Sequence, residues 1–269
     1  MCYYNGQKVT HDEFIRLKHL EKLVANYDFL SRDLQVGFDY NQIAVLKRRP
    51  DVEDFDIVQM EWGFIPRYLK TREDVFKMRN GYKDATGKFR PQIITLNAVC
   101  EELLNPGKIY REAALKRRCL ILSTGFYEWR HIYPLNKRTG LPLKTANKYP
   151  YYISLKDKGY FYMAAIWQPW TDQATGEYVD TSAIVTTKAN QLMEQVHNSK
   201  KRMPTILNED LAFEWMFGDL DERRILEIAA SQYPAREMQA CSIAKDFREA
   251  LNPTREFSYE DVPALELNL

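Results

Sequence analysis

The stretch CLILSTGFYEW, residues 119–129, decides the fold class of this chain. Four apolar residues in a row open it and three aromatic residues lie near its end, a composition typical of a buried strand. We therefore expect one strand over the whole stretch, preceded by a helix at 110–117. The next segment, 131–150, is rich in Pro, Lys and Asn, which indicates a long loop on the substrate side of the chain.

Short apolar runs on both sides of this stretch predict more strands than helices. The expected strands are 43–47, 55–62, 90–97, 151–155, 160–167, 182–187 and 238–243, with a hairpin joining 151–155 to 160–167. The expected helices are 11–30, 100–104, 189–196, 209–216 and 221–231. Many short strands with few helices predict an α+β fold, a single compact domain over residues 1–269 around a mixed, barrel-like β-sheet with peripheral helices.

The composition limits the class of protein. The 269 residues have a net charge of +1, 45% apolar residues and a mean hydropathy of -0.50, which indicates a soluble protein with a sizeable core. No apolar run is long enough to span a membrane, and the first residues lack the features of a signal peptide, so we expect a cytoplasmic monomer. Four cysteines far apart, without a CxxC pair, indicate neither a metal site nor a disulfide framework, and nothing indicates a cofactor.

The basic residues gather in short clusters. They are KRR at 47–49, KRR at 116–118, RH at 130–131, KR at 137–138 and KKR at 200–202. Any one such cluster is usually solvated surface. Because acidic residues gather elsewhere, the pattern is also compatible with a basic groove for nucleic acid.

Cys2 is the most informative single residue. If Met1 is removed, Cys2 carries an α-amine and a thiol on adjacent carbons, with ordinary pKa values of about 8 and 8.5. Such an aminothiol reacts with an aldehyde: the amine forms an imine, and the thiolate closes a five-membered thiazolidine. An internal cysteine cannot do this because its nitrogen is an amide. The alternative is an incidental second residue.

Five segments together resemble a known family. They are MC at 1–2, WGFIP at 62–66, TLNA at 95–98, RCL leading to GFYEW at 118–129, and VH followed by RMP at 196–204. In order and approximate spacing they are similar to the SRAP family, the SOS-response-associated peptidases or abasic-site processing proteins. The resemblance covers about residues 1–210, which leaves 211–269 as a C-terminal extension.

The resemblance implies a function and four site residues. Family members bind single-stranded DNA, crosslink to abasic sites through a thiazolidine, and process their own N-terminal cysteine. Carried over, Cys2 becomes the nucleophile and Asn97 holds the terminal amine and the sugar. Glu128 becomes the general acid and base, and His197 a partner for the sugar hydroxyl or phosphate and for proton transfer. The implied partner is single-stranded DNA containing abasic sites.

The residues themselves leave alternatives open. Glu128 lies among aromatic residues, so it is either a desolvated carboxyl group with a raised pKa or an outward strand residue. His197 at a helix end is either a site residue or a capping or surface histidine. Asn97 is either a ligand holder or an N-cap. Trp62 and Phe64 are either core residues or, if exposed, a stacking wedge for unpaired bases.

The chain also departs from the family pattern where DNA would bind. Tyr3 and Tyr4 replace a Gly and an Arg, and Val99 replaces an Arg. Extra residues lengthen the spacing between His197 and the RMP motif. We expect Lys200, Lys201 and Arg202, with the 131–150 loop, to supply the missing positive charge toward phosphates.

Two rival functions remain at this stage. One is an N-terminal-nucleophile peptidase or amidohydrolase, in which the amine of Cys2 acts as base for its own thiol. The other is a noncatalytic single-strand binder that uses Trp62, Phe64 and the basic loops.

Overall fold

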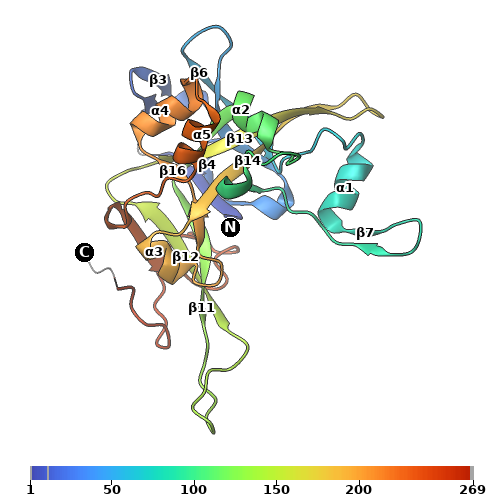
Figure 1. Ribbon diagram of the computed structural model, residues 1–269. Helices are drawn as coiled ribbons and strands as arrows, with labels where there is room; N and C mark the ends of the chain where they lie inside the picture. Colours follow the sequence, from blue (N-terminus) through green and yellow to red (C-terminus); the bar gives the residue numbers. More distant parts are fainter. Residues whose placement is uncertain (1, 11, 267–269) are drawn as a thin grey trace.

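A closed five-stranded barrel forms the centre of the computed structural model, which describes residues 2–10 and 12–266 (Figure 1). The ring closes because β14 pairs with both β13 and β6, and the β14–β6 pairing is parallel. The barrel strands are β5 (Gln42–Arg48), β6 (Phe55–Trp62), β10 (Arg118–Ser123), β13 (Phe161–Thr171) and β14 (Tyr178–Lys188). Three short strands pair at its rim: β9 (Asn97–Val99), β15 (Arg202–Pro204) and β16 (Ile206–Leu207).

A second, antiparallel sheet packs beside the barrel. In spatial order its strands are β17 (Met238–Ser242), β12 (Asn147–Leu155), β11 (Gly125–Ile132), β1 (Tyr4–Lys8) and β4 (Ser31–Val36). The stretch that predicted one strand therefore becomes two, β10 in the barrel and β11 in this sheet. At the crossing, the Ser123 hydroxyl accepts from the Gly125 N–H and donates to the Gly125 carbonyl, both at 3.1 Å. A Cβ on Gly125 would lie 2.2 Å from the Tyr152 ring, so only glycine fits this crossing.

The predicted helix at 11–30 is wrong. Residue 11 lies outside the described residues, and the rest forms a hairpin of β2 (Phe14–Leu17) and β3 (Leu20–Leu23) followed by the 3-10 turn η1 (Val24–Asn26). Ile15 and Leu17 are fully buried on one face of β2, so the burial period is two and not 3.6. Lys18 has a φ of 55° in the two-residue turn, which a helix would not allow.

Two further predictions on strands need correction. The expected hairpin between 151–155 and 160–167 does not form, because β12 pairs with β11 and β17 while β13 pairs with β10, β14 and β16. The expected strand at 90–97 keeps only its ends, β8 (Phe89–Arg90), paired with β7 (Tyr82–Lys83), and the start of β9. The local pattern of apolar residues correctly predicted the strands at 151–155 and 160–167, but each pairs with strands that are distant in sequence and not with the other.

The helices lie around the barrel, as predicted, and the α+β fold class is confirmed. They are α1 (Arg72–Asn80), α2 (Arg111–Lys116), α3 (Gln191–Val196), α4 (Glu209–Phe217) and α5 (Glu222–Ala229), with 3-10 turns η2 (Gly37–Asp39), η3 (Cys100–Glu102) and η4 (Ala235–Glu237). Among the α-helices of the described residues, α1 was not expected, and neither were the 3-10 turns η2 and η4. No helix in the described ranges 2–10 and 12–266 is long and apolar enough to cross a membrane.

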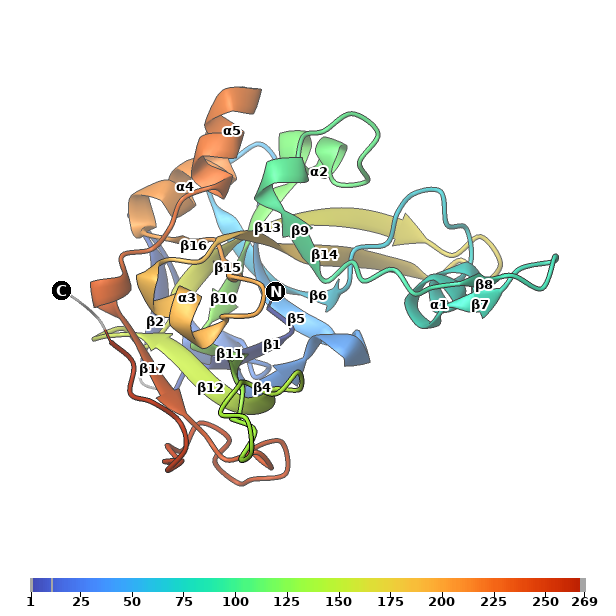
Figure 2. The same ribbon diagram turned by 60° about the horizontal axis from the view of Figure 1, so that its bottom comes forward.

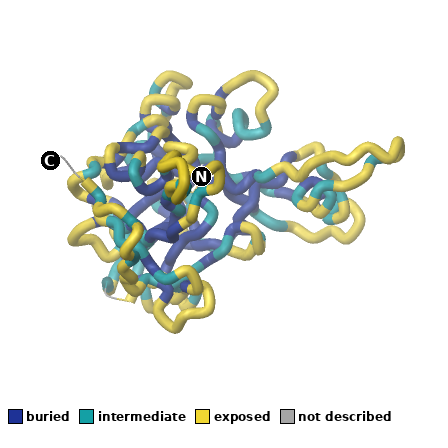
Figure 3. The backbone as a smooth tube through the Cα atoms, turned by 90° about the horizontal axis from the view of Figure 1, so that it is seen from below, coloured by how far each residue is buried: buried dark blue, intermediate teal, exposed yellow. Residues whose placement is uncertain are grey.

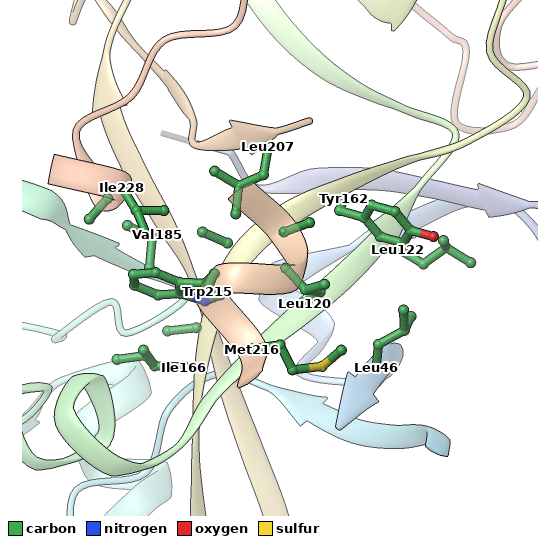
Figure 4. Close-up of a cluster of buried hydrophobic side chains, with 14 of the residues drawn as sticks. Leu46, Leu120, Leu122, Tyr162, Ile166, Val185, Leu207, Trp215, Met216 and Ile228 are labelled. Carbon is green, nitrogen blue, oxygen red and sulfur yellow. The ribbon is translucent and has the colours of Figure 1, made fainter. Parts of the chain in front are cut away.

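The core has two main layers. Outside the barrel, α2, α4 and α5 bury a cluster around Trp215, whose indole N–H lies 3.1 Å from the carbonyls of both Cys119 and Ala165 (Figure 4). A second buried cluster lies on the opposite face of the barrel strands, includes Trp62, Cys119 and Cys2, and also takes side chains from β11, β12 and α3. Figure 3 shows this continuous buried centre and the exposed segments that project from it. The second cluster is important because the chemistry-bearing residues lie at its edge.

Candidate active site

The four residues that the resemblance singled out come together in space. Cys2 precedes β1, Asn97 begins β9, Glu128 lies in β11, and His197 ends α3. Figure 2 shows the N-terminal residues beside α3 and β11. All four are less than 10% exposed. We call these four residues the Cys2 cluster.

Asn97 holds the main chain of Cys2. Its side-chain amide donates to the Cys2 carbonyl at 2.9 Å, and β9 is fixed by parallel pairing with β14. The amide oxygen of Asn97 is buried and accepts no hydrogen bond from the residues that the structure describes. It therefore remains available as an acceptor beside the first residues of the chain.

The Cys2 thiol is fully buried and donates to the Tyr4 carbonyl at 3.6 Å. Burial, and after it the charge of Glu128, raises the pKa of this thiol. The group is therefore a thiol and not a thiolate around neutral pH. A base must remove its proton before it can act as a nucleophile.

Glu128 points inward from β11, on the same face of the strand as Phe126. It is 4% exposed, which selects the desolvated carboxyl group over the outward strand residue. Burial raises its pKa to about 7. A carboxyl group with such a pKa can both donate and accept a proton near neutral pH, as a general acid and base requires.

His197 faces Glu128. Its Nε2 lies 3.6 Å from Oε2 of the carboxyl group, and its Nδ1 lies 2.8 Å from the Arg202 carbonyl. Because a carbonyl only accepts, Nδ1 carries the proton and Nε2 presents a lone pair to Glu128. Burial lowers the pKa of His197 to about 4, so the ring is neutral around pH 7.

The Asn198 side chain holds the chain next to His197 against β11, the strand that contains Glu128. Asn198, next to His197, accepts from the His131 N–H at 2.9 Å and donates to the His131 carbonyl at 2.8 Å. The extra residues before the RMP motif form a tight turn, with Lys201 at a φ of 50° and its N–H bonded to the His197 carbonyl. The lengthened spacing therefore does not displace His197 from the cluster.

Trp62 and Phe64 are core residues, so the prediction that they form a stacking wedge for DNA bases is wrong for this conformation. Each is 1% exposed, and the Trp62 indole donates to the Leu96 carbonyl at 3.1 Å. Phe64 packs edge-on against Tyr110. Both side chains are core residues that support the strand entering Asn97, so neither presents a face to a base in this conformation.

The predicted phosphate ligands divide into two groups. Arg202 is held inside the protein, with Nη1 2.7 Å from Glu101 and Nη2 2.6 Å from the Thr186 carbonyl. Lys200 and Lys201 are exposed on the turn after His197, and Lys201 lies 3.8 Å from Glu194. Only the two lysines are placed to meet a polyanion from solvent. The predicted 131–150 loop is shorter than expected, because its ends belong to β11 and β12 and Tyr149 is buried. The remaining residues, 133–146, project away from the body (Figure 1).

Two residues next to the cluster were not singled out by the sequence. Tyr3 is half-buried, and burial followed by the charge of Glu128 raises its phenol pKa to about 12. Arg130 is 9% exposed, lies two residues beyond Glu128 on the same face of β11, and donates to the Pro263 carbonyl. Strand alternation from Glu128 could have indicated Arg130. In the described part of the chain, no group of three His, Cys, Asp or Glu side chains gathers as a metal site would.

The sequence profile of the SOS response associated peptidase (SRAP) family matches residues 1–250. The chain belongs to the SRAP family. The match passes well beyond residue 210, because α4, α5 and β17 complete the outer core and the second sheet.

Several SRAP proteins can be compared with this chain. It is 27% identical over 186 residues to the abasic site processing protein YoqW of Bacillus subtilis, which covers 69% of this chain and 68% of that protein. It is 26% identical over 211 residues to the abasic site processing protein HMCES of Gallus gallus, covering 69% and 54%. A crystal structure of a protein from Bacteroides thetaiotaomicron superposes with a TM-score of 0.70 at 26% identity, covering 94% of this chain and 97% of the other.

Proposed function

We propose that this SRAP protein binds single-stranded DNA and forms a covalent thiazolidine crosslink with abasic sites through Cys2, after Met1 is removed. The convergence of the Cys2 cluster carries this proposal, because it gathers a nucleophile, a proton donor and acceptor, and an amide holder at one point. The names of the relatives YoqW and HMCES, both abasic site processing proteins, support the substrate.

Removal of Met1 is the first step, and Met1 lies outside the described residues. The new α-amine of Cys2 forms on the same α-carbon that bears the carbonyl held by Asn97 at 2.9 Å. We assign this removal to the same cluster, as autoproteolysis. The Cys2 thiol adds to the Met1 carbonyl carbon while Glu128 takes its proton, and the Cys2 nitrogen leaves as an amine that receives this proton from Glu128. Water then hydrolyses the thioester, which releases Met1 and restores the thiol. The new amine then lies beside the amide oxygen of Asn97.

The crosslink needs proton transfers but no oxidant. The Cys2 amine adds to the sugar aldehyde carbon and gives a carbinolamine. Glu128 protonates its hydroxyl group, which leaves as water and gives an imine. The thiol then adds to the imine carbon while the nitrogen takes a proton, closing the ring. His197 receives and returns protons at Nε2, since Nδ1 is committed to the Arg202 carbonyl. Run in reverse, the same groups would release the intact abasic strand, whereas elimination of the 3′ phosphate from the imine would cleave the strand as a lyase does.

The experiment is incubation of the mature protein with a single-stranded oligonucleotide that contains one abasic site. We expect an adduct that survives denaturation, and none with the same oligonucleotide lacking the abasic site. If the mature protein gives no such adduct but cleaves peptides or amides, the rival N-terminal-nucleophile hydrolase is correct. If it only binds single strands, the noncatalytic binder is correct.

A further inference from the structure

The segment between Trp62 and Asn97 forms a lobe that projects from the barrel (Figures 1 and 2). We call residues 64–96 the aromatic lobe; it contains α1 and the β7–β8 hairpin. Five large apolar side chains are exposed on it, four of them aromatic: Tyr68 60%, Phe76 66%, Tyr82 40%, Phe89 60% and Ile93 51%. Such a concentration of exposed aromatic surface indicates a binding face.

The aromatic lobe has a net positive charge. Residues 64–96 contain eight Lys and Arg against three Asp and Glu, a net charge of +5 in a chain whose total is +1. The remainder of the chain is therefore net negative. Two of the arginines are internal anchors, since Arg72 and Arg79 both bind Glu61, at 2.9 and 2.6 Å. Lys83 and Lys88 are exposed on the hairpin and add charge beside Tyr82 and Phe89.

A groove of about 600 Å³ lies between α1 and the hairpin. Tyr68, Tyr82 and Ile93 contribute apolar walls, and the charged lining residues are Lys77, Arg90, Asp74 and Asp84. Arg90 pairs with Asp84 at 2.8 Å and Lys77 with Glu73 at 2.6 Å, so the unpaired positive charge beside the groove comes from Lys83 and Lys88 on the hairpin. Aromatic faces interleaved with cations are the arrangement that holds unpaired bases and their phosphates. A purely apolar partner would not require the excess positive charge, and a duplex would hide the base faces that stack.

The aromatic lobe begins and ends at the candidate site. The Trp62 indole donates to the Leu96 carbonyl at 3.1 Å, and the next residue, Asn97, donates to Cys2. Three residues lie between Ile93 in the groove and Asn97, and the four Cα-to-Cα steps of extended chain span at most about 14 Å. The lobe is also rigid at its base, where the Arg79 guanidinium lies 3.8 Å over the Tyr40 ring.

We propose that the aromatic lobe is a stacking platform for the unpaired nucleotides that flank an abasic site on the same strand. This inference rests on the proposed function for the position of the lesion at Cys2, and it adds a second, separate binding face. The lobe would hold one flank, 5′ or 3′, because it lies on one side of the Cys2 cluster. It would accept any sequence, since every base has a face that stacks.

The test uses three oligonucleotides that each contain an abasic site. One has a single nucleotide on each side, and the others extend by about eight unpaired nucleotides on the 5′ side only or the 3′ side only. Noncovalent affinity is measured by fluorescence anisotropy with a tetrahydrofuran analogue of the abasic site, which has no aldehyde and forms no imine, for Tyr82→Ala, Phe89→Ala and the matched control Phe257→Ala. Phe257 is also an exposed aromatic residue, 48% exposed, but lies near the C-terminus.

We expect each lobe variant to weaken binding about tenfold for one extended oligonucleotide and to leave the short one unchanged. The control should bind all three normally. Equal affinity of the lobe variants and the control for every oligonucleotide would overturn the inference, and so would a loss of equal size for the short and the extended oligonucleotides. Adduct formation by the protein with its native Cys2 on the short oligonucleotide is scored separately. If no adduct forms, the proposed function is wrong. The affinities of the lobe variants for the extended oligonucleotides still decide whether the lobe binds the flanking nucleotides.

Discussion

The Cys2 cluster and the aromatic lobe place reactive and aromatic residues in opposite settings. In the cluster, Glu128 and His197 are buried. Burial raises the pKa of Glu128 and lowers that of His197, which favours the neutral form of each side chain. In the lobe, Tyr82 and Phe89 are exposed on a hairpin with excess positive charge. Proton transfer benefits from a dry, fixed environment, whereas capture of a flexible strand benefits from open faces and long-range charge. The comparison therefore predicts that chemistry and binding can be separated by mutation.

The largest effect is expected at Glu128. Glu128→Gln keeps the size of the side chain but cannot shuttle a proton, so crosslinking should slow about 10²–10⁴-fold. Exchange of preformed adduct onto fresh abasic DNA should slow at least as much, because ring opening also needs an acid. Noncovalent affinity for single strands should not change. If the variant forms and exchanges the adduct as fast as the wild type, Glu128 has no role in proton transfer and is only a strand residue.

Aromatic residues in the two regions should differ in their effect on stability. Trp62→Ala removes a fully packed core side chain and should lower the free energy of unfolding by about 3–5 kcal/mol. Phe89→Ala removes an exposed ring and should change it by less than about 0.5 kcal/mol. Urea unfolding of both variants measures the contrast. Similar losses would mean that Phe89 is packed in solution and that the lobe is not an open platform.

The buried histidine should give a pH dependence that the lobe cannot give. Because the folded pKa of His197, about 4, lies below its unfolded value of about 6.5, the unfolded chain binds more protons between these values. His197 therefore costs stability as the pH falls from about 6.5 toward 4. His197→Gln should flatten the unfolding free energy over this window, compared with the wild type at each pH. An unchanged slope would place the ring in contact with solvent.

The smallest effect is expected at the turn after His197. Replacing Lys200 and Lys201 by Gln should weaken single-strand binding at every sequence and flatten the salt dependence by about 0.7 per lost phosphate contact. Arg202 is kept, because its bond to Glu101 gives it a structural part that would confuse the result. If the salt slope equals that of the wild type, the two lysines contact no phosphate and are only solvated surface residues.

The two regions also differ in how far the sequence predicts them. The motifs around Cys2, Asn97, Glu128 and His197 pointed to residues that the structure brings together, since each motif is short and its neighbours fix its burial. Trp62 and Phe64 were misjudged because a sequence does not tell a buried aromatic ring from an exposed one. The 11–30 hairpin was missed because apolar residues three apart fit both a helix and a two-residue turn at Lys18. The lobe escaped notice because its charge excess is hidden in a total of +1.

The most direct test of the central claim is the adduct formed by Cys2→Ala, with and without borohydride. Because the variant lacks the thiol that would remove Met1, it is prepared with residue 2 as its first residue. It then has a free α-amine that can form an imine with the abasic aldehyde, but it cannot close a thiazolidine. We predict that the mature wild-type protein gives a denaturation-resistant adduct without reductant, whose mass is that of protein plus DNA less one water. The Cys2→Ala protein should give a stable adduct only when borohydride reduces the imine. A Cys2→Ala adduct of wild-type yield without reductant would contradict the role of the Cys2 thiol.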